Sequence, residues 1–256
     1  VRGGAKPIFS YGFIVLNILF FFVQLSQPGN LVCELGSIPN EIVNGQDYHT
    51  LFTSMFMHGG WMHLIGNMLF LWVFADNIEA TIGNFNFLIF YLMGGLAASA
   101  AHILLSYGDP AALVNCCSVC ADFDCSGQTA ICPGSIPSVG ASGAISAVLG
   151  AYLVMFPKSK VKVLVVYFFR SFRISAMWFL GFWIAQQLFS GFAALGPEAA
   201  ASSGVAWWAH IGGFVFGVIA GFVQRSGGRG RGRLESSTKK APSKRKPRNY
   251  GSDDFV

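Results

Sequence analysis

The chain has 256 residues, of which 53% are hydrophobic, 15% aromatic and only 11% charged. Soluble globular domains carry roughly 25% charged residues, so this composition excludes an ordinary soluble domain and predicts a membrane protein. The length suits one bundle of about six spans, because each crossing takes roughly 20 apolar residues. The net charge is +5, and the cationic residues are gathered in three regions.

Six apolar windows without Lys or Arg predict six transmembrane helices, at about residues 8–24, 62–74, 85–105, 140–156, 176–192 and 207–223. No small-residue cleavage site follows the first window, so we expect a retained span rather than a signal peptide. The predicted fold class is an all-α polytopic membrane protein with a six-helix bundle. We expect a short N-terminus (1–7), a membrane domain (8–224) and a basic tail (225–256).

The cationic residues orient these spans. Of the 17 Lys and Arg residues, two precede the first window, five lie between the fourth and fifth windows, and ten follow the sixth. With six crossings these three regions share one side of the membrane. The positive-inside rule predicts that this side, with both termini, is cytoplasmic.

The cysteines all fall in loops that are predicted to lie on the opposite, outer side. Cys33 belongs to the first outer loop, and a long loop of residues 106–139 holds the other five: Cys116, Cys117, Cys120, Cys125 and Cys132. An even number of cysteines outside the cytoplasm favours disulfides, although their spacing does not assign the pairs. A zinc site is the less favoured alternative, because the two separated pairs of a zinc ribbon are missing.

Two segments on the cytoplasmic side are not expected to span. Residues 161–169 form a mostly apolar stretch that is too short to cross, so we expect it to lie at the membrane surface. The tail, rich in Gly, Ser, Arg and Lys, is predicted to be disordered. The positive charge of the tail is more typical of a segment that is attracted to the membrane surface and fixes the orientation of the protein than of one that binds nucleic acid.

Polar residues inside the windows are informative because they are costly in lipid. His63 and Asn67 are four residues apart at the start of the second window, Ser142 opens the fourth, and His210 is near the start of the sixth. These three spans all run from outside to inside, so the four side chains should lie at similar depth. Each alone could be an interhelical contact. Together they favour a catalytic site.

The chemistry of these residues suggests a serine nucleophile. Ser142 needs a base, and His210 can serve as one near neutral pH. The nearest acid on a relevant helix, Asp76, lies about 20 Å deeper than His63, so we expect a dyad rather than a triad. The oxyanion donors would be the Ser142 backbone N–H, the Asn67 amide and the His63 imidazole, each typically worth about 3 kcal/mol.

Small residues beside these positions predict close helix packing. Gly140 and Gly143 flank Ser142, while Gly213 and Gly217 follow His210 at four-residue spacing. Such stripes let helix backbones approach closely, which would bring the Ser142 hydroxyl within reach of the His210 ring. We assign these glycines a structural role near the site.

At these residues the sequence resembles the rhomboid family of intramembrane serine proteases. Gly140-Ala141-Ser142-Gly143 is similar to the family's G-x-S-G, and His63 with Asn67 is similar to its H-x-x-x-N. His210-Ile211-Gly212-Gly213 resembles the sixth-span histidine motif, His58 resembles a common upstream histidine, and Asn77-Ile78-Glu79 with Gly83 resembles the turn after the second span.

The resemblance implies a six-helix bundle that hydrolyses peptide bonds of transmembrane substrates in a water-filled cavity open to the outside. It implies that Ser142 is the nucleophile, that His210 is the general base and acid, and that His63 and Asn67 stabilise the oxyanion. No cofactor and no metal are implied, the expected partners are transmembrane protein substrates and the lipid bilayer, and no nucleic acid is expected.

The chain departs from the family pattern at three places. Tyr48 and His49 stand where family members often carry a Trp-Arg pair, and Ser146 stands where some carry an aromatic ring that stacks on the base. His210 must then be positioned in another way. The cysteine-rich loop lies outside the shared pattern and is a candidate for control of substrate access or for a partner contact.

Two rival hypotheses remain. The first is a catalytically silent rhomboid-like protein that binds or escorts membrane clients, although such relatives typically lose the serine or the histidine. The second is a metal site of His58, His63 and His210, which is disfavoured because the chain has no H-E-x-x-H. We expect a bacterial plasma membrane with the site on the extracytoplasmic side; a secretory-pathway membrane would satisfy the same charge asymmetry.

Overall fold

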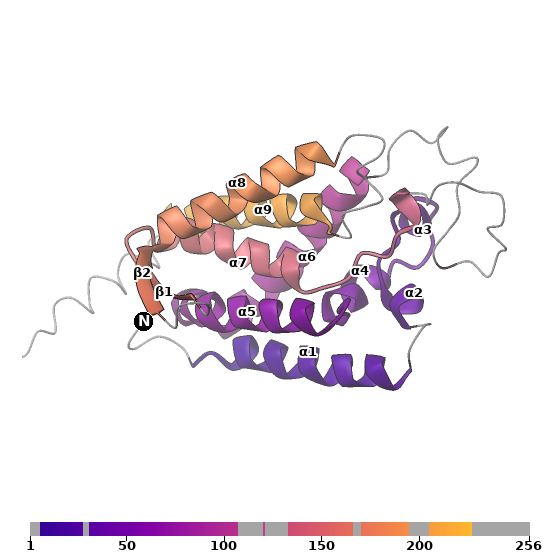
Figure 1. Ribbon diagram of the computed structural model, residues 1–256, viewed down its shortest axis with the longest axis horizontal. Helices are drawn as coiled ribbons and strands as arrows, with labels where there is room; N and C mark the ends of the chain where they lie inside the picture. The colour runs from indigo at the N-terminus through magenta and orange to yellow at the C-terminus, as the bar shows by residue number, and fades with distance from the viewer. Residues whose placement is uncertain are drawn as a thin grey trace, which may run out of the picture.

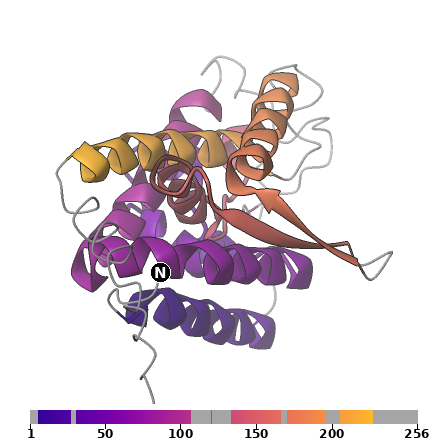
Figure 2. The same cartoon turned by 90° about the vertical axis from the view of Figure 1, so that its left-hand side faces the viewer.

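A computed structural model describes residues 6–27, 31–106, 120, 133–165, 170–194 and 205–226. Helices occupy all six apolar windows: α1 (Ile8–Ser26), α5 (Trp61–Ile82), α6 (Asn84–Ser106), α7 (Ser142–Met155), α8 (Ala176–Ala193) and α9 (Trp207–Ser226). They pack side by side, with α1 beneath α5, α7 in the middle, and α8 and α9 beyond it (Figures 1 and 2).

In the described part of the chain, three of these helices are long and apolar enough to cross a membrane: α1, α6 and α9. Helix α7 is apolar but has only 14 residues. The crossing of α5, α7 and α8, and with it the six-span count and the cytoplasmic placement of the termini, remains a prediction.

Helix α7 forms the centre of the bundle and contacts α5, α6, α8 and α9. Eleven of its 14 residues are buried. A helix that is apolar on every side is expected to be surrounded by other helices. Its Gly and Ala residues allow this, because small side chains let neighbouring backbones approach.

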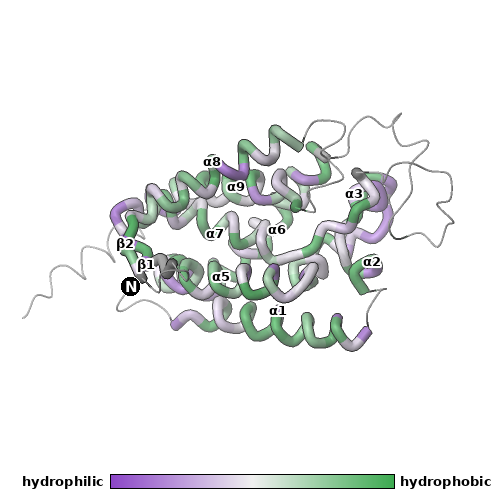
Figure 3. The backbone as a smooth tube through the Cα atoms, viewed as in Figure 1, coloured by the Kyte–Doolittle hydropathy of each residue, from purple (hydrophilic) through white to green (hydrophobic). Residues whose placement is uncertain are grey.

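Helix α1 lies at the edge of the bundle, and most of its residues are hydrophobic (Figure 3). Phe13 and Phe21 are buried against the bundle, whereas Val15, Leu19 and Phe22 are exposed. Exposing large apolar side chains costs free energy in water but not in lipid. The exposed face of α1 therefore fits an integral membrane protein.

Two polar side chains, Glu79 and Arg225, join the helices at the end of the bundle opposite the loop between α1 and α5. The buried Glu79 carboxylate on α5 accepts hydrogen bonds from the Phe9 and Ser10 backbone N–H groups at 2.9 and 2.7 Å, and from the Ser10 hydroxyl at 2.6 Å. It therefore caps the first turn of α1, whose N–H groups have no partner within the helix. Arg225 of α9 donates to the Val154 carbonyl near the end of α7 at 3.2 Å.

The chain is mostly helical rather than all-α, because residues 160–165 and 170–175 pair as two β-strands, called the hairpin below. Strands β1 (Lys160–Val165) and β2 (Arg170–Ser175) are antiparallel, with Lys162 opposite Arg173. Lys and Val alternate at the start of β1, which is the period-2 pattern of a strand and is not visible from the length of the apolar stretch. The hairpin extends sideways below α8 (Figure 2).

The loop between α1 and α5 contains short helices: α2 (Leu31–Leu35), α3 (Pro39–Val43), α4 (Thr50–Thr53) and the 3-10 turn η1 (Ser54–Phe56). A disulfide joins Cys33 of α2 to Cys120. The preference for disulfides is confirmed for this pair; Cys116, Cys117, Cys125 and Cys132 lie outside the described residues.

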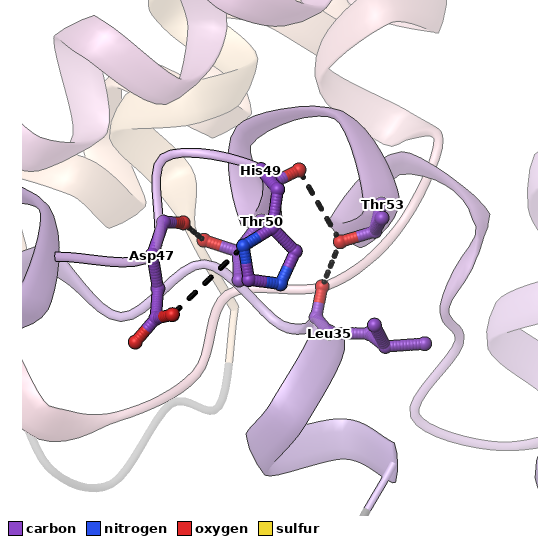
Figure 4. Close-up of polar contacts among 5 residues, drawn as sticks. All are labelled: Leu35, Asp47, His49, Thr50 and Thr53. Atoms are coloured by element: carbon purple, nitrogen blue, oxygen red, sulfur yellow. Dashed lines mark hydrogen bonds and ion pairs between the residues drawn. The ribbon is translucent and has the colours of Figure 1, made fainter.

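Local hydrogen bonds hold this loop together (Figure 4). The Thr53 hydroxyl donates to the Leu35 carbonyl at 2.8 Å, and the Thr50 hydroxyl donates to the Asp47 carbonyl at 2.7 Å. His49, one of the two residues that depart from the family pattern, is exposed and lies 3.8 Å from the Asp47 carboxylate. The packing of the loop therefore rests on the threonines.

Candidate active site

Ser142 opens α7 directly after a segment that the loop between α1 and α5 holds in place. Ser37 and Ser138 exchange two backbone hydrogen bonds, at 3.0 and 2.8 Å, and the Gly140 N–H donates to the Ser54 carbonyl at 2.8 Å. Gly140 has a φ of +125°, a conformation that L side chains rarely adopt. The turn before Ser142 thus depends on glycine and on pairing with a loop distant in sequence.

His210 lies in the first turn of α9, and its Nε2 is 2.8 Å from the Ser142 Oγ. The glycines named above explain how the two helices come so close. A Cβ at Gly213 would lie 2.2 Å from the Gly143 carbonyl oxygen, and one at Gly217 would lie 1.9 Å from the Ala147 carbonyl oxygen. Any side chain at these positions would push α9 away from α7.

The other ring nitrogen of His210 contacts Gln187 of α8: its Nδ1 is 2.7 Å from the Gln187 Oε1. An amide oxygen can only accept, so the neutral ring carries its proton on Nδ1 and its Nε2 lone pair faces the serine. The Ser142 hydroxyl therefore donates to His210. This is the arrangement that a general base requires.

Two aromatic rings contact His210, although α7 carries Ser146 at the position where some family members have an aromatic ring. The Trp183 ring of α8 lies 6.0 Å from the His210 ring between centroids, and the Trp207 ring lies 6.3 Å away, edge to face. Ser146 is buried and donates to the Ser142 carbonyl at 2.6 Å. The ring contacts to the base thus come from α8 and α9.

His63 lies on the other side of Ser142, near the start of α5. Its Nδ1 accepts the Gly59 N–H at 3.2 Å, so the neutral ring carries its proton on Nε2. A Cβ built at Gly140 would lie 2.8 Å from that Nε2 and 3.6 Å from the Ser142 Oγ. The His63 N–H donor and the serine hydroxyl therefore flank the same glycine.

Asn67 is one turn further along α5, with 6% of its surface exposed. Its Nδ2 is one of the few buried polar side-chain atoms in the described residues that have no hydrogen-bond partner. A buried amide donor without a partner is costly, which is often a sign of a role in binding or catalysis. An oxyanion would give this donor its acceptor.

The turn before α5 keeps His63 in position. The Gln24 side chain of α1 forms two hydrogen bonds with the His58 backbone, at 2.6 and 3.0 Å, and His58 is fully buried against His63 with ring centroids 5.3 Å apart. Burial, and then the neighbouring His63 ring, lower the pKa of His58 to about 4. His58 is therefore a neutral supporting residue.

The comparison with known families agrees with this geometry. Residues 45–227 match the family model described as the rhomboid domain. The chain belongs to the rhomboid family. The matched region includes all four residues of the predicted site and begins after α1.

Three rhomboid relatives are similar to this chain. Rhomboid protease GluP of Bacillus subtilis (strain 168) is 31% identical over 58% of the chain. Rhomboid protein 1, mitochondrial, of Saccharomyces cerevisiae is 28% identical over 69%, and RHOMBOID-like protein 5 of Arabidopsis thaliana is 27% identical over 74%. The matches cover 24%, 43% and 48% of these relatives, so the chain spans less than half the length of each.

The sequence did not single out two residues beside this rhomboid site. Gln187 and Trp183, both on α8, contact the base. Gln187 is a polar residue inside an apolar window, which is the same signal that singled out His63 and Asn67. The signal could not identify its partner, because the hydropathy of α8 does not show which residue of α9 packs against Gln187.

The metal-site hypothesis finds no support in this geometry. Within the described ranges, no group of three or more His, Cys, Asp or Glu side chains is arranged to hold a metal ion. The ring nitrogens of His210 face Ser142 and Gln187, and one of those of His63 accepts from Gly59.

Proposed function

We propose that this rhomboid protein is an intramembrane serine endopeptidase that hydrolyses peptide bonds in or near the transmembrane segments of membrane proteins. The observation that carries the proposal is the 2.8 Å contact between the Ser142 Oγ and the His210 Nε2. A hydrogen bond of this length from a hydroxyl to an imidazole is the arrangement in which the ring can take the proton as the oxygen attacks.

The first step is acylation. Ser142 Oγ attacks the scissile carbonyl carbon while His210 Nε2 takes the hydroxyl proton, and the imidazolium then gives that proton to the leaving amine. The carbonyl oxygen becomes an oxyanion between the Ser142 backbone N–H, the Asn67 amide and the His63 Nε2–H. The unpaired Asn67 Nδ2 and the tautomer of His63 support this assignment.

The second step is deacylation by water. His210 Nε2, now neutral again, takes a proton from the attacking water, and the ester bond to Ser142 breaks with return of the proton to the serine oxygen. Ser142, His63 and His210 are each partly exposed, whereas Asn67 is buried. Partial exposure at the helix N-termini supports access of peptide and water from that end of the bundle.

The arrangement of charge supports a site that faces away from the cytoplasm. The hairpin with Lys160, Lys162 and Arg173 lies at the end of the bundle opposite α2 and α3 (Figure 1), and the Cys33–Cys120 disulfide belongs to the α2 end. We propose residues 8–224 as the membrane domain, with both termini cytoplasmic. The proposed location is a bacterial plasma membrane; two relatives are a protein named as mitochondrial and a plant protein.

The experiment that tests the proposal uses purified protein reconstituted with a single-span substrate. Wild type should cleave the substrate and react with a fluorophosphonate probe, and Ser142→Ala should do neither while keeping the thermal unfolding of wild type. Cleavage by Ser142→Ala, or a wild type that neither reacts nor cleaves, would instead indicate a different nucleophile or a silent client-binding protein.

A further inference from the structure

Helix α8 presents a narrow buried face to α9, and Gln187 is the polar residue on it. The buried residues of α8 are Ala176, Leu180, Gln187 and Gly191. A Cβ at Gly191 would lie 3.1 Å from Ile211 Cδ1, so α8 and α9 are in close contact at the level of His210. Gln187 is 3% exposed.

Both ends of the Gln187 amide have partners. Its Oε1 lies 2.7 Å from the His210 Nδ1, and its Nε2 donates to the Gln186 Oε1. Gln186 in turn donates to the Ser190 hydroxyl at 3.2 Å. Burying an amide in an apolar segment is costly unless it is hydrogen-bonded, so this chain of contacts compensates the cost.

The Gln187 amide turns its oxygen to His210 and its Nε2 to the exposed Gln186 side chain. The orientation of this amide decides the tautomer of the ring. If the amide were reversed, its NH2 group would face His210 Nδ1, and the ring would have to place its proton on Nε2. The lone pair needed by Ser142 would then be lost.

We infer that Gln187 is a positioning residue of the Ser142–His210 dyad: its side-chain oxygen holds His210 in the Nδ1–H tautomer and orients the ring toward the serine. It takes the place that a carboxylate has in a serine triad, but without a charge. The inference rests on the proposed function, because it assigns Gln187 a role in the same reaction. It also explains how the base is held although α7 carries Ser146.

The first measurement does not depend on catalysis. We expect the imidazole nitrogen signals of histidine-labelled protein, with His210→Gln to assign the His210 pair, to show the Nδ1–H tautomer in wild type. In Gln187→Met, which keeps the length of the side chain but has no oxygen, the Nδ1–H tautomer should no longer be the main form of His210. An Nε2–H tautomer in wild type, or no change in Gln187→Met, overturns the inference.

The second measurement separates positioning from folding. Gln187→Met should lower kcat and the rate of fluorophosphonate labelling about tenfold or more, with KM changed by less than about twofold, because a lost orienting hydrogen bond acts on the reacting groups. Gln187→Glu restores an acceptor and should recover most of kcat. It should also move the acid limb of the kcat profile to higher pH, because a carboxylate stabilises the imidazolium more than an amide does.

The matched control is Phe189→Leu, on the same helix but 77% exposed, which should leave kcat, labelling and tautomer unchanged. Unchanged kcat in Gln187→Met, or the same loss in Gln187→Glu, contradicts the positioning role. If the tautomer follows Gln187 but wild type neither labels nor cleaves, the positioning stands and the proposed function alone fails.

Discussion

The close approach of α7 and α9 should control the reactivity of the serine, and Gly213→Ala tests this. A Cβ at Gly213 would lie 2.2 Å from the Gly143 carbonyl oxygen, whereas ordinary contact begins near 3.4 Å. If α9 moves away from α7 to relieve the overlap, the shift is about 1.2 Å. The distance from His210 Nε2 to Ser142 Oγ would then grow from 2.8 Å to about 4 Å, too long for a hydrogen bond.

A misplacement of about 1 Å at reacting groups can cost on the order of 100-fold in rate. We therefore expect Gly213→Ala to lower both kcat on a reconstituted transmembrane substrate and the fluorophosphonate labelling rate by about that factor. Overpacking should also lower the free energy of unfolding by about 1–3 kcal/mol, measured by thermal unfolding in detergent.

The matched control is Gly181→Ala on α8, where a Cβ would meet nothing within 4 Å. It should leave kcat unchanged and should stabilise the helix by up to about 1 kcal/mol, because Gly is a poor helix former. Full kcat and labelling in Gly213→Ala would refute the argument that helix apposition sets the serine–histidine distance.

Three further predictions concern the oxyanion donor, the supporting histidine and the disulfide. Asn67→Ala should lower kcat about 100-fold or more with little change in KM, as expected for a donor used only in the transition state; an unchanged kcat would remove Asn67 from the mechanism. The pKa of His58 is about 4 in the fold and near 6.5 in the unfolded chain, so the unfolded chain binds the extra proton between these values. The contribution of His58 to the free energy of unfolding should therefore be constant above about pH 6.5 and fall by up to about 1.4 kcal/mol per pH unit toward pH 4; thermal unfolding of His58→Phe across this range should show a shallower fall than wild type, and an equal one would contradict the assignment. Replacing Cys33 and Cys120 by Ser removes a cross-link between positions 87 residues apart, which should lower the free energy of unfolding by about 2–4 kcal/mol; unfolding temperatures that do not differ from wild type would show that this link does not stabilise the fold.

The hairpin shows why hydrophobicity alone does not predict this region. Residues 161–169 are too short to span a membrane, but Lys160, Val161, Lys162 and Val163 alternate with the period of a strand. Pairing with residues 170–175 turns that alternation into a strand with Val161 buried and Lys160 and Lys162 exposed. The second strand supplies the backbone partners, which a window over the first strand cannot reveal.

The sequence by itself was sufficient to predict helices in the six apolar windows and to propose a common depth for Ser142, His210, His63 and Asn67. These inferences need only the local cost of polar groups in lipid and the direction of each span. The tertiary structure decided the partners: Gln187 on the base, Gly59 on His63, the loop that fixes Gly140, and the pairing of Cys33 with Cys120. Hydropathy is a property of one segment, whereas a hydrogen bond of about 3 Å depends on how two segments distant in sequence pack together.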